Sequence, residues 1–209
     1  LDGYQILDLT SVIMGPFATQ TLGDMGADVI KVESPNGDVT RQIGPARNIG
    51  MSAMYLNTNR NKRSLVLNLK RKEGREILLR LSKSADVVIH SMRPKAIARL
   101  GLTYADFQTT KPDIIYCGCY GFGKEGPYAD RPAYDDVIQG VSGLSSIMGF
   151  NSREPKHVPA LIADKTSGMA VTQAIAFALL HRERTGEGQS IEVPMFCLLY
   201  TSPSPRDAT

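Results

Sequence analysis

Short apolar runs alternate with helix-forming stretches through the first 120 or so residues of the chain. An apolar run over residues 4–12 is followed by a stretch over 15–27 that is typical of a helix closed by glycine, and then by a β-branched run over 28–34. The same kinds of segment recur, with strands expected over 64–69, 86–92 and 113–122 and helices over 71–85, 94–102 and 103–112. Strands that alternate with helices predict an α/β fold with a mostly parallel sheet and helices on both faces.

The pattern changes after Gly121, where glycine and proline punctuate residues 121–150. A polar loop over 151–159 leads into a long alanine-rich helix, and a final strand is expected over 190–200. The last nine residues, 201–209, are rich in Ser and Pro and have no apolar face, so we expect a disordered tail or one foreign to the native continuation.

Composition narrows the classes of function. The 209 residues suffice for one sizeable domain or for part of a larger protein. The 24 Lys and Arg against 21 Asp and Glu give a net charge of +3 with both signs interspersed, which argues against a nucleic-acid partner and suits a small anionic ligand. No run reaches the ~18 apolar residues that span a membrane, and residues 1–12 lack the regions of a signal peptide. We therefore expect a cytoplasmic protein with no membrane partner.

The cysteines and histidines favour neither a disulfide framework nor a metal site. The three cysteines, Cys117, Cys119 and Cys197, form no CxxC pair, and the three histidines are scattered. Cys117 and Cys119 alternate along one expected strand, so both side chains point to one face as small apolar fillers. Neither has an evident His partner, which makes a nucleophilic role a poor interpretation.

The first β-α turn is the natural place to look for a ligand, because open α/β sheets bind beyond the carboxyl ends of their strands. Gly15 followed by Pro16 lets the backbone approach a ligand and begins the next helix. Glu33 ends the following strand, where an NAD-binding domain often keeps its ribose carboxylate. The GxGxxG spacing is absent, so dinucleotide binding is disfavoured against a plain helix start.

Basic residues occur in three local sets, over 60–63, 70–72 and 93–99. The first two flank one expected strand and the third follows another, so some of these side chains are candidates for phosphate binding at one edge of the sheet. Each set taken alone is better explained as a solvated face.

Asp164 precedes the alanine-rich helix and has two interpretations. Asp is among the best helix N-caps, and the helix that follows carries basic residues at its end and Gly186 after it, so local signals favour a cap. The alternative is a nucleophilic carboxylate placed where helix-end amides stabilise a developing oxyanion. Spacing does not separate the two.

Four further residues are weaker candidates. Asp135 and Asp136 are adjacent and so point in different directions, which favours capping or solvation over a catalytic pair. Tyr134 is a core residue or a ligand contact, with core packing favoured. His90 ends an expected strand near a possible site, yet a lone His is more often structural.

Eight landmarks follow one another from residue 3 to about residue 196: ILDLTSVIMGPFATQTLGDMGADVIKVE, NGDVTR, NRNKRSLVLNLK, ADVVIHSMRP, RLGLTY, IIYCGCYGFGKEGPYADRPAYDDVIQGVSGL, LIADKTSGM and RTGEGQSIEV. In these landmarks the chain resembles the class III CoA-transferases, the family of formyl-CoA transferase, carnitine CoA-transferase and α-methylacyl-CoA racemase. The resemblance implies that residues 1–196 are the N-terminal, Rossmann-like portion that binds CoA and carries the catalytic aspartate. Residues 197–209 are then a strand end and the tail.

The resemblance also implies an activity, the transfer of CoA from an acyl-CoA to a free carboxylic acid through covalent intermediates on an aspartate. Asp164 inherits that role from the ADKTSG segment. A carboxylate with a reference pKa of ~3.9 is ionised at neutral pH and needs no base. No metal and no prosthetic group are expected, since coenzyme A and acyl-CoA are substrates.

The family's CoA site runs along the strand ends of the Rossmann-like domain. The contacts that the resemblance implies here are Val12, Ile13, Ser34, Leu67, Lys70, Ser91, Met92, Arg99 and Arg131. Part of the scattered basic surface would then meet the phosphates of CoA.

Two departures from the family pattern bear on function. The racemase branch has His immediately before the Asp of the YDD segment, where this chain has Tyr134, so transfer is favoured over racemisation or epimerisation. Family members are about twice this long and form interlocked homodimers, and a glycine-rich loop over the aspartate comes from the other half. The truncated chain is therefore not expected to be catalytically active by itself.

A non-catalytic nucleotide-binding fragment is the third interpretation of the chain. The identities of the donor and acceptor acids stay open.

Overall fold

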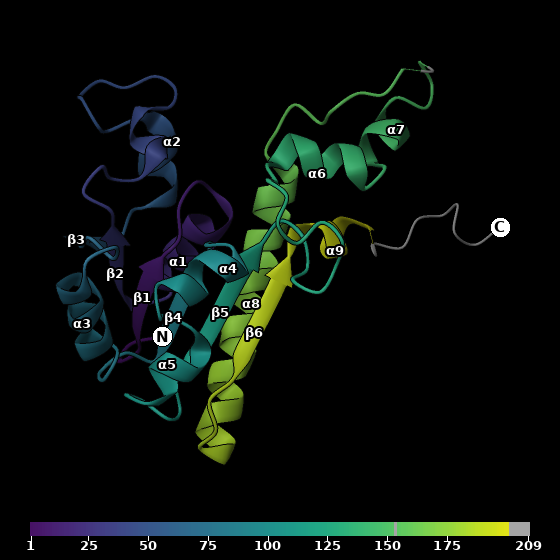
Figure 1. Cartoon of the computed structure of the whole chain (residues 1–209). Coiled ribbons are helices and arrows are strands. Elements are labelled where there is room, and N and C mark those ends of the chain that lie inside the picture. The colour runs from purple at the N-terminus through teal and green to yellow at the C-terminus, as the bar shows by residue number, and fades with distance from the viewer. Residues whose placement is uncertain (153, 201–209) are drawn as a thin grey trace.

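Six parallel strands form one sheet in a computed structural model that describes residues 1–152 and 154–200. Their order across the sheet is β3-β2-β1-β4-β5-β6 (Figure 1). The strands are β1 Gln5–Leu9, β2 Asp28–Glu33, β3 Lys62–Val66, β4 Val87–His90, β5 Ile115–Tyr120 and β6 Ser190–Pro194. The predicted parallel α/β sheet is confirmed, and the tail expected over 201–209 lies outside the described residues.

Helices cover both faces of the sheet, because successive side chains of each buried strand point to opposite faces. The helices are α1 Met14–Asp24, α2 Ala53–Thr58, α3 Lys72–Leu81, α4 Pro94–Arg99, α5 Tyr104–Gln108, α6 Asp135–Val141, α7 Leu144–Met148, α8 Ile162–Thr185 and α9 Met195–Tyr200, with a 3-10 helix at Val39–Gln42. Ile6 packs in one apolar cluster with α1 and α8, whereas its neighbour Leu7 packs in a second cluster with α3, α4 and α5.

Two segments extend beyond the carboxyl edge of the sheet (Figure 1). One contains the 3-10 helix and α2, which follow β2, and the other contains α6 and α7, which follow β5. The second segment occupies the glycine- and proline-punctuated stretch. Its helices are short, since left-handed Gly143 separates α6 from α7.

The strand expected over residues 190–200 is wrong in its second half. Pairing ends at Pro194 opposite Tyr120, which is the last residue of β5, and Met195–Tyr200 forms α9 instead. Strand β3 also begins and ends earlier than predicted, at Lys62–Val66 rather than over 64–69. In both places an apolar run alone does not distinguish a strand from a helix or fix its ends, because the partner strand decides where the ladder stops.

Helices α1 and α8 pack closely on one face of the sheet, and two glycines permit that approach. A Cβ atom added at Gly168 of α8 would lie 2.8 Å from the Met14 carbonyl oxygen and 2.8 Å from Cδ1 of Phe17. A Cβ atom at Gly15 would lie 2.3 Å from Cγ2 of Thr10, at the end of β1. Glycine at 168 therefore lets the second turn of α8 approach the amino end of α1, and glycine at 15 lets α1 begin close to the end of β1.

Replacing Gly168 with Ala should force α8 away from α1 and lower the free energy of unfolding by about 1–3 kcal/mol, measured in urea. Gly140→Ala is the matched control, because a Cβ atom there meets nothing within 4 Å and Ala is the better helix former. The control should raise stability by about 0.5–1 kcal/mol. Equal stabilities of the two variants would contradict the close packing.

Candidate active site

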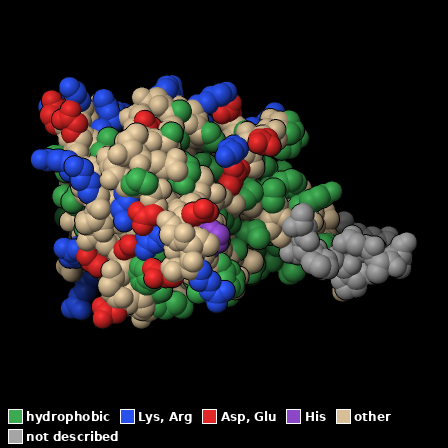
Figure 2. All heavy atoms as spheres, turned by 90° about the horizontal axis from the view of Figure 1, so that it is seen from below, with side chains coloured by type: hydrophobic (Ala, Val, Ile, Leu, Met, Phe, Trp, Pro, Cys, Tyr) green, Lys and Arg blue, Asp and Glu red, His purple; other side chains and the backbone are tan. Residues whose placement is uncertain are grey.

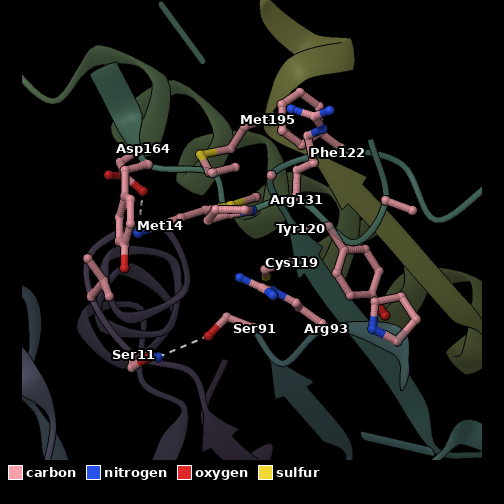
Figure 3. A pocket seen from close by; sticks show the side chains of 17 residues that line it. Ser11, Met14, Ser91, Arg93, Cys119, Tyr120, Phe122, Arg131, Asp164 and Met195 are labelled. Carbon is pink, nitrogen blue, oxygen red and sulfur yellow. Dashed lines mark hydrogen bonds between the residues drawn. The ribbon is translucent and has the colours of Figure 1, made fainter. Parts of the chain in front are cut away.

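A cavity of about 200 Å³ opens at the carboxyl edge of the sheet, beyond the ends of β1, β4 and β5 (Figure 3). The strand order reverses between β1 and β4, and ligands of open α/β sheets bind at such a switch point. The cavity is lined by Ser11, Val12, Met14, Ser91, Arg93, Pro94, Cys119, Tyr120, Gly121, Phe122, Ala129, Arg131, Pro132, Ala133, Tyr134, Asp164 and Met195.

The turn after β1 forms one wall of this cavity and is backbone-strained. Val12 has a φ of 72°, in the left-handed region that a β-branched residue rarely adopts. Such a conformation costs about 1–3 kcal/mol and persists only where its surroundings hold it. The Ser11 amide donates to Oγ of Ser91 at 3.2 Å, and the Thr10 amide donates to Oδ1 of Asp8 at 2.9 Å. These bonds tie the strained turn to β4 and to β1.

Two buried ion pairs lie beneath the turn. Nζ of Lys62 is 3.0 Å from Oδ2 of Asp8, and Nζ of Lys31 is 2.9 Å from Oδ2 of Asp38 and donates to the Thr10 carbonyl at 3.1 Å. Burial opposes ionisation of Asp8, but the two ammonium groups hold its pKa below the ordinary value. Burial lowers the pKa of Lys62 to about 8, against the pull of Asp8. Both partners of the Asp8 pair therefore stay charged at neutral pH, and they support the turn from below.

Asp164 does not cap its own helix, so the favoured cap interpretation is wrong. The N-cap of α8 is Leu161, and Asp164 is the third residue of the helix. Its Oδ1 instead accepts a hydrogen bond from the Met14 amide at 3.2 Å, at the amino end of α1, which has no side-chain cap of its own (Figure 3). The carboxylate thus faces the positive end of a neighbouring helix and borders the cavity.

Asp135 orients the backbone at Asp164. Its Oδ1 accepts the Asp164 amide at 2.9 Å, and its Oδ2 accepts Nε2 of Gln139 at 2.6 Å. Gln139 in turn accepts the Val158 amide at 2.8 Å, in the loop that leads to α8. Asp135 therefore caps α8 and not its own helix, and the adjacent Asp136 is exposed, as expected of a solvated residue.

Asp164 is an unusually weak acid for an aspartate. Burial raises its pKa to about 6, the charge of Asp135 adds to the rise, and the Met14 amide opposes it. The residue is only 7% exposed. At neutral pH it is mostly ionised and more basic than an ordinary aspartate, which favours attack on an electrophile.

A second cavity of about 640 Å³ adjoins the first and shares Ser11 with it. It lies beyond the ends of β1, β2 and β3, next to the 3-10 helix and its preceding loop. The two cavities thus lie side by side along the carboxyl edge, and the smaller one is beside Asp164.

The nine residues expected to contact CoA distribute over the two cavities. Val12, Ser91 and Arg131 line the smaller one, and Ser34, Leu67, Lys70 and Met92 line the larger one. Ile13 is buried and Arg99 is exposed, and neither lines either of these two cavities. The structure brings seven of the nine together with Asp164 along one edge, and their binding role stays a prediction.

The basic residues that the sequence groups into sets differ in whether they form ion pairs or line a cavity. In the first, Arg60 pairs with Asp24 and Arg63 with Asp28, so both belong to the solvated surface. In the second set, Lys70 lines the larger cavity. Figure 2 shows Lys, Arg, Asp and Glu side chains interspersed over the face seen from below, as the sequence predicts.

Three other sequence interpretations are settled by burial and contacts. Core packing of Tyr134 is wrong, because the ring is 65% exposed and lines the smaller cavity. Glu33 is held by Arg41 at 2.6 Å and by Oγ of Ser64 at 2.7 Å, so it is not a free acceptor for a ribose. His90 is fully buried, with its ring 4.9 Å from that of Tyr116, and burial lowers its pKa to about 4.

The cysteines behave as the alternation predicts. Cys117 and Cys119 are buried in the same apolar cluster, and the hydrogen-bonded Cys117 thiol together with burial raises the pKa of Cys119. Over residues 1–152 and 154–200 no group of three or more His, Cys, Asp or Glu side chains is placed to hold a metal ion. Within the same ranges no helix has the length and apolarity needed to cross a membrane.

Arg93 is the site residue that sequence reasoning missed. It was visible only as a member of a basic set, yet it follows β4 at the switch point and lines the smaller cavity with Asp164. Its position three residues after the end of a central strand is the signal that would have singled it out.

Comparison with known proteins gives one consistent result. The family model described as CoA-transferase family III matches residues 1–202. Succinate–glutarate CoA-transferase of Agrobacterium fabrum is 44% identical over 202 residues, 93% of this chain and 50% of that protein. Acetyl-CoA:oxalate CoA-transferase of Acetobacter aceti is 42% identical over 198 residues, 93% of this chain and 50% of that protein. The chain thus spans about half the length of the curated relatives it matches.

Solved structures agree. The crystal structure of a CAIB/BAIF family protein from Brucella suis superposes with a TM-score of 0.91 and 41% sequence identity, over 95% of this chain and 54% of that one. A structure of Rv3272 from Mycobacterium tuberculosis gives a TM-score of 0.90 and 36% identity, over 96% and 56%.

The raised pKa of Asp164 predicts a stability cost that depends on pH. The folded state resists ionisation of a group whose unfolded pKa is near 3.8, so the cost is present above pH 6 and disappears as the pH falls toward 4. Asp164→Asn keeps an oxygen acceptor for the Met14 amide and removes the charge. It should raise the free energy of unfolding at pH 7.5 by about 1–3 kcal/mol, with little gain at pH 4.

Urea unfolding at the two pH values measures this difference. Asp136→Asn is the control, since Asp136 is exposed, and it should shift stability by less than about 0.5 kcal/mol at either pH. A loss of stability in Asp164→Asn at pH 7.5 would show that the carboxylate is not strained by its surroundings.

Proposed function

The chain belongs to CoA-transferase family III, and we propose that the whole protein moves coenzyme A from an acyl-CoA to a free carboxylic acid with Asp164 as its nucleophile. The single observation that carries the role of Asp164 is its placement. A buried carboxylate of raised pKa faces the amino end of α1 and borders a cavity at the switch point of the sheet. A nucleophile for a thioester needs this combination of basicity, orientation and access.

The proposed reaction begins with attack by an oxygen of Asp164 on the thioester carbonyl carbon. The carbon–sulfur bond breaks, CoA leaves as the thiolate, and the donor acyl group and Asp164 share a mixed anhydride. The thiolate then attacks the Asp164 carbonyl carbon, which releases the donor acid as a carboxylate and leaves an aspartyl-CoA thioester. The acceptor carboxylate repeats the two steps in reverse order and departs as its CoA ester. Each step exchanges one anionic nucleophile for one anionic leaving group, so no net proton transfer is required.

The Met14 amide is placed to stabilise the negatively charged tetrahedral intermediates of this reaction. It donates to Oδ1 of Asp164 at 3.2 Å in the structure. When Asp164 carries an acyl group or CoA, the oxygen in that place becomes a carbonyl oxygen, and attack on its carbon turns it into an oxyanion. An amide at the amino end of a helix of eleven residues stabilises negative charge there.

The two cavities are consistent with binding of the two ends of the CoA molecule in different places. We place the nucleotide in the larger one, where the ammonium group of Lys70 is available for phosphate, and the thioester in the smaller one beside Asp164. Ser11 lies where the cavities join, so the pantetheine arm would pass over the strained turn that contains Val12.

The relatives support carboxylic acids as acceptors, since their names refer to succinate, glutarate and oxalate. We place the enzyme in the cytoplasm as a homodimer with no prosthetic group. The dimer agrees with large apolar side chains exposed on the α6 and α7 segment, namely Val137, Val141, Ile147 and Met148.

Trapping of the acylated aspartate tests the mechanism. The full-length protein incubated with its acyl-CoA and hydroxylamine should carry a hydroxamate at Asp164, detected by mass spectrometry of its peptides. Asp164→Ala should lower kcat by about 10⁴-fold or more, whereas Asp136→Asn should leave it within about twofold. Peptides without the label during turnover would exclude the covalent route.

The pH profile gives an independent test of the same residue. Because protonated Asp164 is not a nucleophile, kcat/KM should fall on the acid side with an apparent pKa near 6. Exchange of the α-proton of the acyl-CoA with solvent deuterium in the absence of an acceptor acid would indicate an epimerase instead. The exposed Tyr134 in the cavity makes that outcome the less expected one, since the racemase branch has His there.

A further inference from the structure

Two arginine side chains line the smaller cavity together with Asp164, and they differ in their partners. The guanidinium of Arg131 lies 5.1 Å from the centroid of the Tyr128 ring. Arg93 extends into the middle of the cavity (Figure 3), and among residues 1–152 and 154–200 its guanidinium has no ion-pair, hydrogen-bond or ring partner. Lys95, two residues further on, pairs with Asp130, and neither of these residues lines the cavity. Arg93 is therefore the cation available to a ligand there.

An anion from the substrate would balance the charges that line the cavity once water is excluded. Asp164 is the acidic residue that lines it, and in the proposed reaction this carboxylate becomes an uncharged anhydride or thioester. The cavity then holds two guanidinium groups and no protein carboxylate. The acid carried as a CoA ester has also lost the charge of its reacting carboxyl group. A second carboxylate on the same acid would restore the balance, and a guanidinium binds a carboxylate through two parallel hydrogen bonds.

The size of the cavity favours an acid with a short chain. Its volume is about 200 Å³, whereas the adjoining cavity measures about 640 Å³. Pockets that enclose drug-sized ligands span roughly 300–1,000 Å³. The smaller cavity therefore suits an acid of a few carbon atoms, and a long apolar acyl chain would in addition bring methylene groups against a guanidinium without satisfying it.

The phosphates of CoA are the competing anions, and the layout argues against them as the partner of Arg93. Arg93 lines only the smaller cavity, and Lys70 lines only the larger one. A nucleotide in the larger cavity keeps its phosphates beside Lys70. The thioester end, which must reach Asp164, is the part of the donor that approaches Arg93.

We propose that Arg93 binds the second carboxylate of a short dicarboxylic acid whose first carboxyl reacts at Asp164. This inference rests on the proposed function and names the substrate class for the same site. Arg93 acts as a specificity-determining residue, since it takes no part in the bonds that form and break. It selects the diacid by leaving a guanidinium unpaired when a monocarboxylate of equal length is bound.

Exchange of a labelled acid with its own CoA ester tests the inference in the full-length protein, because it needs no knowledge of the natural acid pair. Succinate with succinyl-CoA is compared with butyrate and butyryl-CoA, which has the same chain length and lacks the second carboxylate. The wild-type enzyme should prefer succinate. Arg93→Met should lower kcat/KM for succinate roughly 10- to 100-fold and change that for butyrate by less than about twofold.

Two further variants and one binding measurement control the result. Arg93→Lys keeps the charge without the planar fork and should retain part of the preference for succinate. Lys95→Met removes a neighbouring surface cation that is paired with Asp130 and should leave both exchange rates unchanged. Titration with CoA alone should give the same dissociation constant for Arg93→Met and the wild type, which also shows that the variant is folded.

The outcomes separate this inference from the proposed function. Exchange of butyrate at least as fast as succinate in the wild type would overturn the inference and leave the transferase intact. Equal loss of both exchanges in Arg93→Met, or weaker binding of CoA, would assign Arg93 to the CoA moiety and would likewise overturn it. No exchange of any acid by the wild type would overturn the proposed function, and the inference with it.

Discussion

The close contact between the first two turns of α8 and the first turn of α1 is the constraint on which the site depends. Gly168 permits it, because any larger residue would collide with the Met14 carbonyl oxygen. The contact brings together the amino ends of three helices that are remote in sequence, since Met14 begins α1, Asp135 begins α6 and Asp164 lies in the first turn of α8. Each carboxylate then accepts an amide hydrogen from another helix. A set of interlocking caps thus fixes the proposed nucleophile without a dedicated loop.

The same contact explains why the Asp164 carboxylate is well oriented and why its ionised form lowers the stability of the folded state. Burial and the neighbouring Asp135 oppose its ionisation, whereas one amide hydrogen bond favours it, and the net effect is the raised pKa. At pH 7 a group with a pKa of about 6 is still roughly nine-tenths ionised, so the protein keeps the reactive form and gains basicity. The fold carries this cost in the way that functional sites generally do, with the stability supplied elsewhere. Here the sheet and its two apolar clusters supply it.

The parallel sheet could be predicted from the sequence, because each central strand is a short apolar run with a helix signal after it and parallel pairing follows from that alternation. The prediction failed where contacts with another strand or helix determine the local structure. Residues 195–200 are apolar enough for a strand, but β5 offers no further edge to pair with, and they form α9. Asp164 looks like the cap of its own helix, yet it serves α1, some 150 residues away in sequence. Caps that cross between helices have no local spacing signature, so only the packing reveals them.

Two kinds of electrostatic arrangement meet at the carboxyl edge of the sheet and have different consequences. Beneath the first turn, Asp8 pairs with Lys62, and Lys31 pairs with Asp38. These four charges already have partners, and the two pairs support the strained turn that contains Val12. Above the turn, Arg93 has no such partner among the residues that the structure describes. An unpaired guanidinium gains little for the free protein, because water already solvates an exposed cation. Its position becomes favourable only when a ligand excludes that water and supplies an anion. The unpaired charge of Arg93, above two buried ion pairs, is therefore better explained by binding than by stability.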